Sequence, residues 1–212
     1  MGEQKVSLLS DKKEMHSFVR HLLRDVQALE YMLENDWFED DITRIGAEQE
    51  MCIVDNKTFR PQPKAMEVLE LMKGIDWVET ELAKFNLEIG ATPLEFKDKA
   101  LSLMEQEIQG KLDIIQERVQ ALDSSIILTG ILPTLQKFDM GMHNLTPVKR
   151  YFALMEAINK ELKRSAYELR LQGVDELLIK HDSPLLEACN TSFQVHLQVA
   201  PKDFVKMYNI SQ

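Results

Sequence analysis

Two glutamates two residues apart, Glu48 and Glu50, lie in a segment whose composition is typical of a β-strand. Side chains two residues apart in a strand point to the same face of a sheet, so these carboxylates would lie roughly 6–7 Å apart along the strand. Glu88 and His196 lie in two further segments with polar residues on one face and apolar residues on the other. If one sheet holds all three segments, three carboxylates and an imidazole share one face.

Carboxylates gathered on one face repel one another unless a positive charge lies among them. Mg²⁺ and Mn²⁺ prefer carboxylate oxygens, with an occasional imidazole. The spacing of Glu48 and Glu50 suits two neighbouring ions bridged by a nucleotide phosphate, with Glu88 and His196 completing the coordination. These residues therefore predict metal-dependent phosphoryl transfer. The alternative is a solvated polar face, because Glu-x-Glu pairs and single histidines are common on exposed strands.

The elements that must position these residues follow from hydrophobic periodicity. Strands are predicted for 43–54, 84–92 and 192–199, and a buried strand for the apolar run 125–132. Helices are predicted for 10–35, 64–73, 98–122, 146–171 and from 203 onward, with Ser10 and Asp11 as candidate caps of the first and Gly173 as the stop of the fourth. This order predicts an α+β fold with an antiparallel or mixed sheet, a concave polar face, and long helices packed on the apolar face.

Composition limits the function classes. The chain has 212 residues, of which 44% are hydrophobic and 28% charged, as in an ordinary globular domain. Its net charge of −10 argues against a nucleic-acid partner. No run approaches the about 20 apolar residues that span a bilayer, so no membrane partner is expected. Cys52 and Cys189 form no CxxC pair, which favours a reducing, cytoplasmic location and buried, unreactive thiols.

Five segments resemble, in chain order, those of type 2 glutamate–cysteine ligases and related carboxylate–amine ligases. They are TRIGAEQEMCIVD, FNLEIGATPLEF, ILTGILPTL, LTPVKRYFALMEAI and NTSFQVHLQV, and they span about 43–199. In this family the first segment binds magnesium, the fourth is an Arg-Tyr helix beside the substrate pocket, and the fifth supplies a histidine ligand. The resemblance implies a catalytic fold like that of glutamine synthetase and the guanido kinases.

The resemblance also implies an activity. ATP would phosphorylate the γ-carboxylate of glutamate, and an amine such as that of cysteine would displace the phosphate, with Mg²⁺ or Mn²⁺ as cofactor. Arg150 and Tyr151 would lie near the amino-acid substrate or the transferred phosphate, although Arg150 read alone could be a solvated helix residue. No catalytic residue is assigned. The resemblance gives metal-ligand roles to five residues: Glu48, Glu50, Glu88, His196 and, as the weaker candidate, Glu95.

The resemblance begins near residue 43, so we expect two parts: an N-terminal helical segment, 1–41, and the N-terminal part of a ligase-type catalytic domain, 42–212. The family's later strands have no counterpart here, so the chain is expected to be part of a longer protein and could be inactive alone. A non-catalytic, ligase-like domain that binds an amino acid or a nucleotide is the alternative. A metal-dependent hydrolase ranks lower, because no HExxH motif is present. The amine, the metal count and a homo-oligomeric state are left open.

Overall fold

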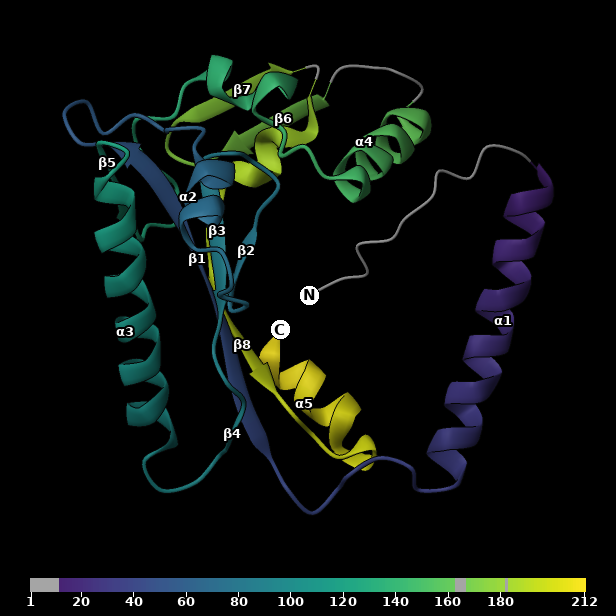
Figure 1. The fold of residues 1–212 in the computed structure, drawn as a ribbon. Helices are drawn as coiled ribbons and strands as arrows, with labels where there is room; N and C mark the ends of the chain where they lie inside the picture. Colours follow the sequence, from purple (N-terminus) through teal and green to yellow (C-terminus); the bar gives the residue numbers. More distant parts are fainter. Residues whose placement is uncertain (1–11, 163–166, 182) are drawn as a thin grey trace.

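One long strand, β1 (Arg44–Asp55), is the centre of the structure. The computed structural model describes residues 12–162, 167–181 and 183–212 (Figure 1). Strands β3 (Asn86–Gly90) and β4 (Leu94–Glu95) pair with one edge of β1. Strands β8 (Phe193–Leu197) and β5 (Ser124–Ile127) pair with its other edge, and β2 (Val78–Thr80) pairs with β3. Every one of these pairings is antiparallel, so the antiparallel form of the predicted α+β fold is confirmed.

Alternation along β1 separates a buried face from an open face. Met51 and Ile53 point into the main core, where they meet Leu87 and Ile89 of β3. The long helix α3 (Ala100–Gln120) covers this face, together with α2 (Ala65–Leu71), as Figure 1 shows. Burial of each such side chain stabilises the fold by about 1.5–3 kcal/mol. Glu48 and Glu50 lie on the opposite face, which is partly open at their positions, whereas Cys52 and Val54 on that face are buried in a smaller core cluster.

A second core cluster holds the helix α4 (Lys149–Glu161) against the same sheet. Tyr151 and Met155 of α4 pack with Phe85 and Leu185, the latter from the 3₁₀ helix η3 (Pro184–Cys189). Asn86 of β3 anchors this 3₁₀ helix, because its Nδ2 donates to the Ala188 carbonyl at 2.7 Å. The start of α4 is therefore fixed beside the ends of β2 and β3.

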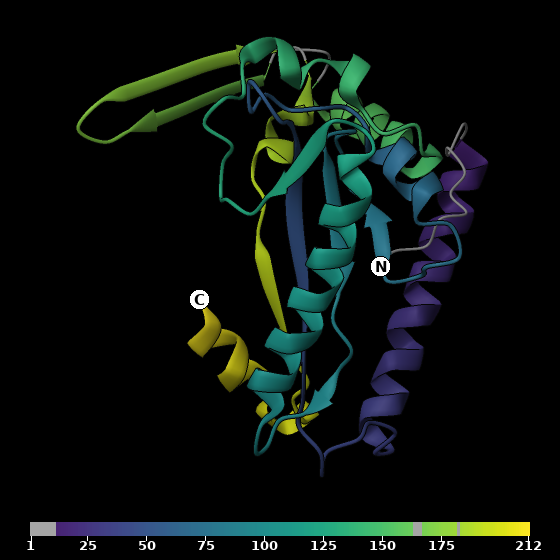
Figure 2. The same ribbon diagram turned by 60° about the vertical axis from the view of Figure 1, so that its left-hand side comes forward.

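The prediction of one helix over 146–171 is wrong beyond Glu161. The structure instead has a hairpin of β6 (Tyr167–Gln172) and β7 (Glu176–His181), which projects from the body in Figure 2. Gly173 lies in the hairpin turn and does not stop a helix. Apolar and polar residues alternate through β6, which is the strand period. Two ion pairs join the strands: Arg170 with Glu176, and Lys180 with Glu168.

The first helix, α1 (Lys12–Glu34), agrees with its prediction, while the predicted caps Ser10 and Asp11 lie outside the described residues. The last helix is α5 (Phe204–Ser211), also as predicted. None of the helices in the described part of the chain is long and apolar enough to cross a bilayer. The remaining difference concerns the apolar run 125–132, of which only β5 forms a strand.

Candidate metal and substrate site

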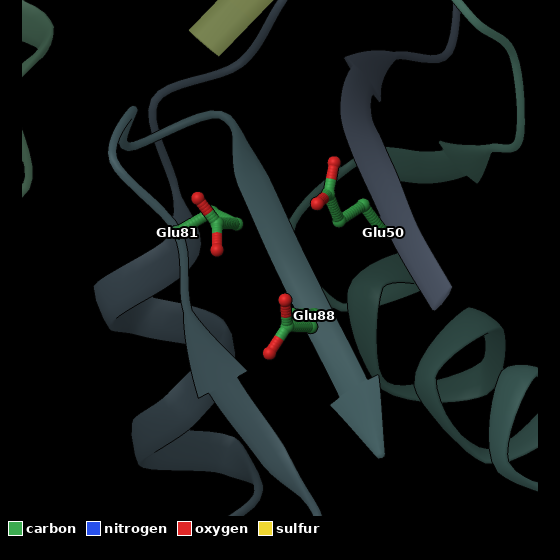
Figure 3. A group of neighbouring side chains, drawn as sticks. All are labelled: Glu50, Glu81 and Glu88. Carbon is green, nitrogen blue, oxygen red and sulfur yellow. The ribbon is translucent and has the colours of Figure 1, made fainter. Parts of the chain in front are cut away.

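Three carboxylates converge on the open face of the sheet. Glu50 comes from β1, Glu88 from β3, and Glu81 from the residue that follows β2 (Figure 3). Each offers one oxygen, and these oxygens lie within 4.8 Å of one another. All three residues are half-buried. This is the geometry with which carboxylates share a divalent cation.

Strand register explains why two of the three meet. Glu50 and Glu88 are direct partners in the β1–β3 ladder, so their side chains leave the sheet side by side. Two hydrogen bonds fix Glu81. Its carboxylate accepts the Leu82 N–H at 2.9 Å, and its backbone carbonyl accepts the Thr146 hydroxyl at 2.6 Å. The third carboxylate therefore depends on the loop before α4.

Glu50 is the most firmly oriented member. Its carboxylate accepts the Ser192 N–H at 2.9 Å, the Ser192 hydroxyl at 3.1 Å and the Gln194 amide at 2.9 Å. These donors come from β8 and the residue before it, on the opposite side of β1 from Glu88. These hydrogen bonds fix one side of the carboxylate, while its other side faces the acidic neighbours.

The electrostatics favour a cation here. Burial, together with the charges of Glu48, Glu81 and Glu50, raises the pKa of Glu88 to about 7. Burial also raises the pKa of Glu81, as does the charge of Glu50, while Arg150 acts in the opposite direction. A carboxylate with a raised pKa gains most from a cation that favours its charged form.

A second polar pair lies further along β1. His196 Nε2 is 3.3 Å from Glu48 Oε2, and their side chains are 53% and 17% exposed. Beside them is a hollow of about 650 Å³, lined in part by Gly46 and Gly90. A Cβ added at Gly90 would meet nothing within 4 Å, and one at Gly46 would lie 3.7 Å or more from its neighbours. The absence of side chains at these two positions keeps the hollow open.

Arg150 and Tyr151 lie next to Glu81. The Tyr151 hydroxyl donates to the Thr80 carbonyl at 3.0 Å, and Arg150 Nη2 donates to that hydroxyl at 2.8 Å. The pKa of Arg150 is raised by this hydrogen bond and by the charges of Tyr151, Glu81 and Glu79. Its Nε is buried and has no hydrogen-bond partner among the described residues. This donor of the guanidinium is therefore unsatisfied in the described part of the structure.

Glu95 lies apart from this group. It belongs to β4, opposite Arg44, and forms an ion pair with Lys97 at 2.6 Å. The cluster of three oxygens does not include it. The structure thus brings Glu50 and Glu88 together with each other, and Glu48 with His196, but leaves Glu95 at the far end of β1.

Sequence reasoning missed Glu81, because the three-residue strand β2 was not recognised. A signal was present: Glu79-Thr80-Glu81 repeats the Glu-x-Glu pattern of Glu48-Gln49-Glu50. Of the two cysteines, Cys52 is buried as the sequence predicts, whereas Cys189 is only half-buried. Both are free, and burial raises the pKa of Cys52 and of Cys189 to about 11, so neither thiol is a ready nucleophile.

Comparison with known families agrees with this arrangement. A sheet that presents converging carboxylates beside an arginine is what a metal-dependent, phosphate-handling enzyme requires. The sequence model of glutamate-cysteine ligase family 2 matches residues 44–211, from the first residue of β1 into α5. The chain therefore belongs to glutamate-cysteine ligase family 2, and this membership implies a carboxylate–amine ligase. Searches of curated proteins and of solved structures found no match.

Proposed function

We propose that this chain carries part of the active site of an ATP-dependent ligase that joins the γ-carboxylate of glutamate to an amine such as cysteine. The family is one of carboxylate–amine ligases that use ATP and a divalent metal. The observation that carries the proposal is the convergence of Glu50, Glu81 and Glu88, with Arg150 beside them.

The donor set fits Mg²⁺ or Mn²⁺. Carboxylate oxygens are the ligands such hard ions prefer, and the raised pKa of Glu88 marks a place where added positive charge is favourable. Glu50, Glu81 and Glu88 would hold one ion, and Glu48 with His196 would hold a second. When bound, such ions neutralise phosphate oxygens and align the reacting groups.

The reaction has two steps. A γ-carboxylate oxygen of glutamate bonds to the γ-phosphorus of ATP, and ADP leaves with the electron pair of the broken bond. The amine nitrogen then attacks the carbonyl carbon of the acyl phosphate, loses a proton, and phosphate departs. Arg150 is suited to a carboxylate or phosphate, because a guanidinium can donate two parallel hydrogen bonds. Tyr151 would position it through the hydrogen bond at 2.8 Å.

In this proposal, the hollow beside Glu48 would hold the phosphates. Its volume of about 650 Å³ lies within the range of ligand pockets. Gly46 and Gly90 form part of its lining, so a phosphate chain could approach the backbone closely there. The hollow joins the position of Glu48 to that of His196, which supports a shared role for the two side chains.

The test uses the complete natural protein with ATP, Mg²⁺, glutamate and a panel of amines. We expect ADP release that requires all three small molecules and the metal. Glu88→Gln should lower kcat at least about 100-fold, because the substitution removes one negative charge from the cluster. Glu105→Gln on α3 is the control and should leave kcat unchanged.

An absence of ADP release with every amine would contradict the proposal. If Mg-ATP and glutamate nevertheless bind, the non-catalytic binding domain becomes the better description. ADP release without an amine requirement would instead indicate a hydrolase.

A further inference from the structure

The helix α1 exposes the apolar side of an amphipathic sequence. Its 23 residues carry a row of six apolar side chains, each between 40% and 55% exposed. In α3, the residues Ile115 and Val119 are fully buried. Among the described elements, α1 packs extensively against no other helix or strand, and it lies beside the body in Figures 1 and 2. Exposed apolar area of this kind marks an interaction surface.

The spacing of the row identifies the kind of partner. Its steps along the chain alternate four, three, four, three, four, which is the heptad pattern of a coiled coil. One set of heptad positions holds Val19, Val26 and Leu33, and the other holds Met15, Leu22 and Leu29. The buried residues of α3, which packs on a sheet, do not keep this alternation: Ala100, Met104, Leu112, Ile115 and Val119. The apolar seam, defined as the six residues of α1, therefore suits another helix.

Charge along α1 specifies which helix. Residues 13–24 carry three basic side chains and one carboxylate, a net charge of +2, whereas residues 25–34 carry three carboxylates and no basic residue, a net charge of −3. This polarity opposes the helix dipole, which favours acidic residues at the N-terminus and basic residues at the C-terminus. An identical helix laid antiparallel would place each basic half against an acidic half.

We propose that α1 forms an antiparallel two-stranded coiled coil with α1 of a second copy of this chain, about a two-fold axis. The seam then closes in complete layers. Met15 meets Leu33 of the second copy, Val19 meets Leu29, and Leu22 meets Val26. Each layer pairs one heptad position with the other, as antiparallel pairing requires.

The residues flanking the seam favour the antiparallel direction. Antiparallel pairing places His16 beside Glu30 of the second copy and Phe18 beside Met32 of the second copy. The one contact between like charges is then that of Asp25 with Asp25 of the second copy. Parallel pairing would set Asp25 against Glu30 twice. The antiparallel dimer therefore has fewer repulsive contacts as well as complementary halves.

The first experiment measures mass by light scattering after size exclusion. We expect the wild-type chain to give about 49 kDa, twice the 24.5 kDa of one copy, at tens of micromolar. Leu22→Lys should raise the dimer dissociation constant at least about 100-fold, because it places two charges in the central layers. Gln27→Lys, outside the seam on the same helix, is the control and should remain a dimer.

Circular dichroism and thermal melting are the controls for folding, and both variants should match the wild-type chain. A wild-type chain that stays monomeric overturns the proposal, and slow amide exchange in α1 would then show that it docks on its own body. A Leu22→Lys protein that remains dimeric also overturns it, since the contact must then lie elsewhere.

The direction is tested with a spin label placed at Lys13 through an unnatural amino acid. Antiparallel pairing puts the two labels roughly 33 Å apart along the axis, at 1.5 Å per residue. Parallel pairing would bring their backbones within about 8–10 Å, the usual spacing of packed helices. The short distance would contradict the antiparallel arrangement.

Discussion

The two glutamates of β1 lie on the same face, yet their surroundings differ. Glu50 is opposite Glu88 of β3 and lies within the three-carboxylate cluster. Glu48, two residues earlier, is opposite Gly90 and beside His196. A single position on the neighbouring strand thus decides whether a carboxylate meets another carboxylate or an open space. Negative charge is concentrated around Glu50, whereas a hollow lies beside Glu48.

This difference leads to an unequal pair of sites. Three half-buried carboxylates attract a divalent cation more strongly than one carboxylate beside an exposed imidazole. We therefore expect the Glu50 end to bind the tighter ion and the Glu48 end to bind the weaker ion. Three predictions test this ranking.

The largest effect should come from Glu50→Gln. Loss of this charge should weaken Mn²⁺ binding at least about 100-fold, because Glu50 is the carboxylate that Ser192 and Gln194 fix in place. Titration calorimetry on the metal-free protein gives the measurement. Glu95→Gln is the matched control and should leave the affinity unchanged, since Glu95 is paired with Lys97. Equal losses in both variants would remove the distinction between the two positions.

The second effect is a pH dependence of stability in the presence of a chelator. The folded-state pKa of Glu88 is raised from 4.5 to about 7 by burial and by its acidic neighbours. The folded state therefore holds a proton that the unfolded state releases, and stability falls as pH rises from about 4.5 to about 7. After allowance for partial solvent exposure, we expect a loss of about 1 kcal/mol.

Urea unfolding across this pH range checks the prediction. Glu88→Gln should flatten the pH profile by about that amount, and saturating Mg²⁺ should oppose the loss above pH 7. A wild-type profile that rises across this range, or an unchanged profile in the variant, would show that Glu88 is not a strained carboxylate.

The smallest effect belongs to His196→Ala. The imidazole is exposed, and its partner Glu48 is partly exposed as well. Its loss should therefore weaken the affinity for the second Mn²⁺ ion by roughly 3–10-fold and leave the affinity for the first ion unchanged. His21→Ala on α1, far from the sheet, serves as the control. A larger loss at the first event than at the second would reverse the ranking of the two ends.

Much of this site could be predicted from the sequence. The strands that carry Glu88 and His196 alternate polar and apolar residues, so their period fixes which side chains share a face. In β1, the spacing of two residues between Glu48 and Glu50 puts these carboxylates on one face. Glu81 could not be found this way, because three residues are too few to show a period. Its position depends on the contacts of Leu82 and Thr146, which are tertiary.

Hydrophobic periodicity is similarly limited for the helices. The period of α1 predicts its helix correctly, but a period says nothing about whether the apolar side meets the body. The leucines after Glu161 recur at short intervals that fit both periods, so the sequence alone does not separate a helix from the hairpin of β6 and β7. The glutamine-synthetase-like fold and the division at residue 42 stay predictions.

The unbroken course of β1 has one more consequence. The strand that presents the acidic side chains also contributes Met51 and Ile53 to the main core. A slip of one residue in its pairing would turn the carboxylates inward and the apolar groups outward. We therefore expect that the proposed cation site forms only in natively folded molecules, so titration with Mn²⁺ would report the folded fraction of a preparation.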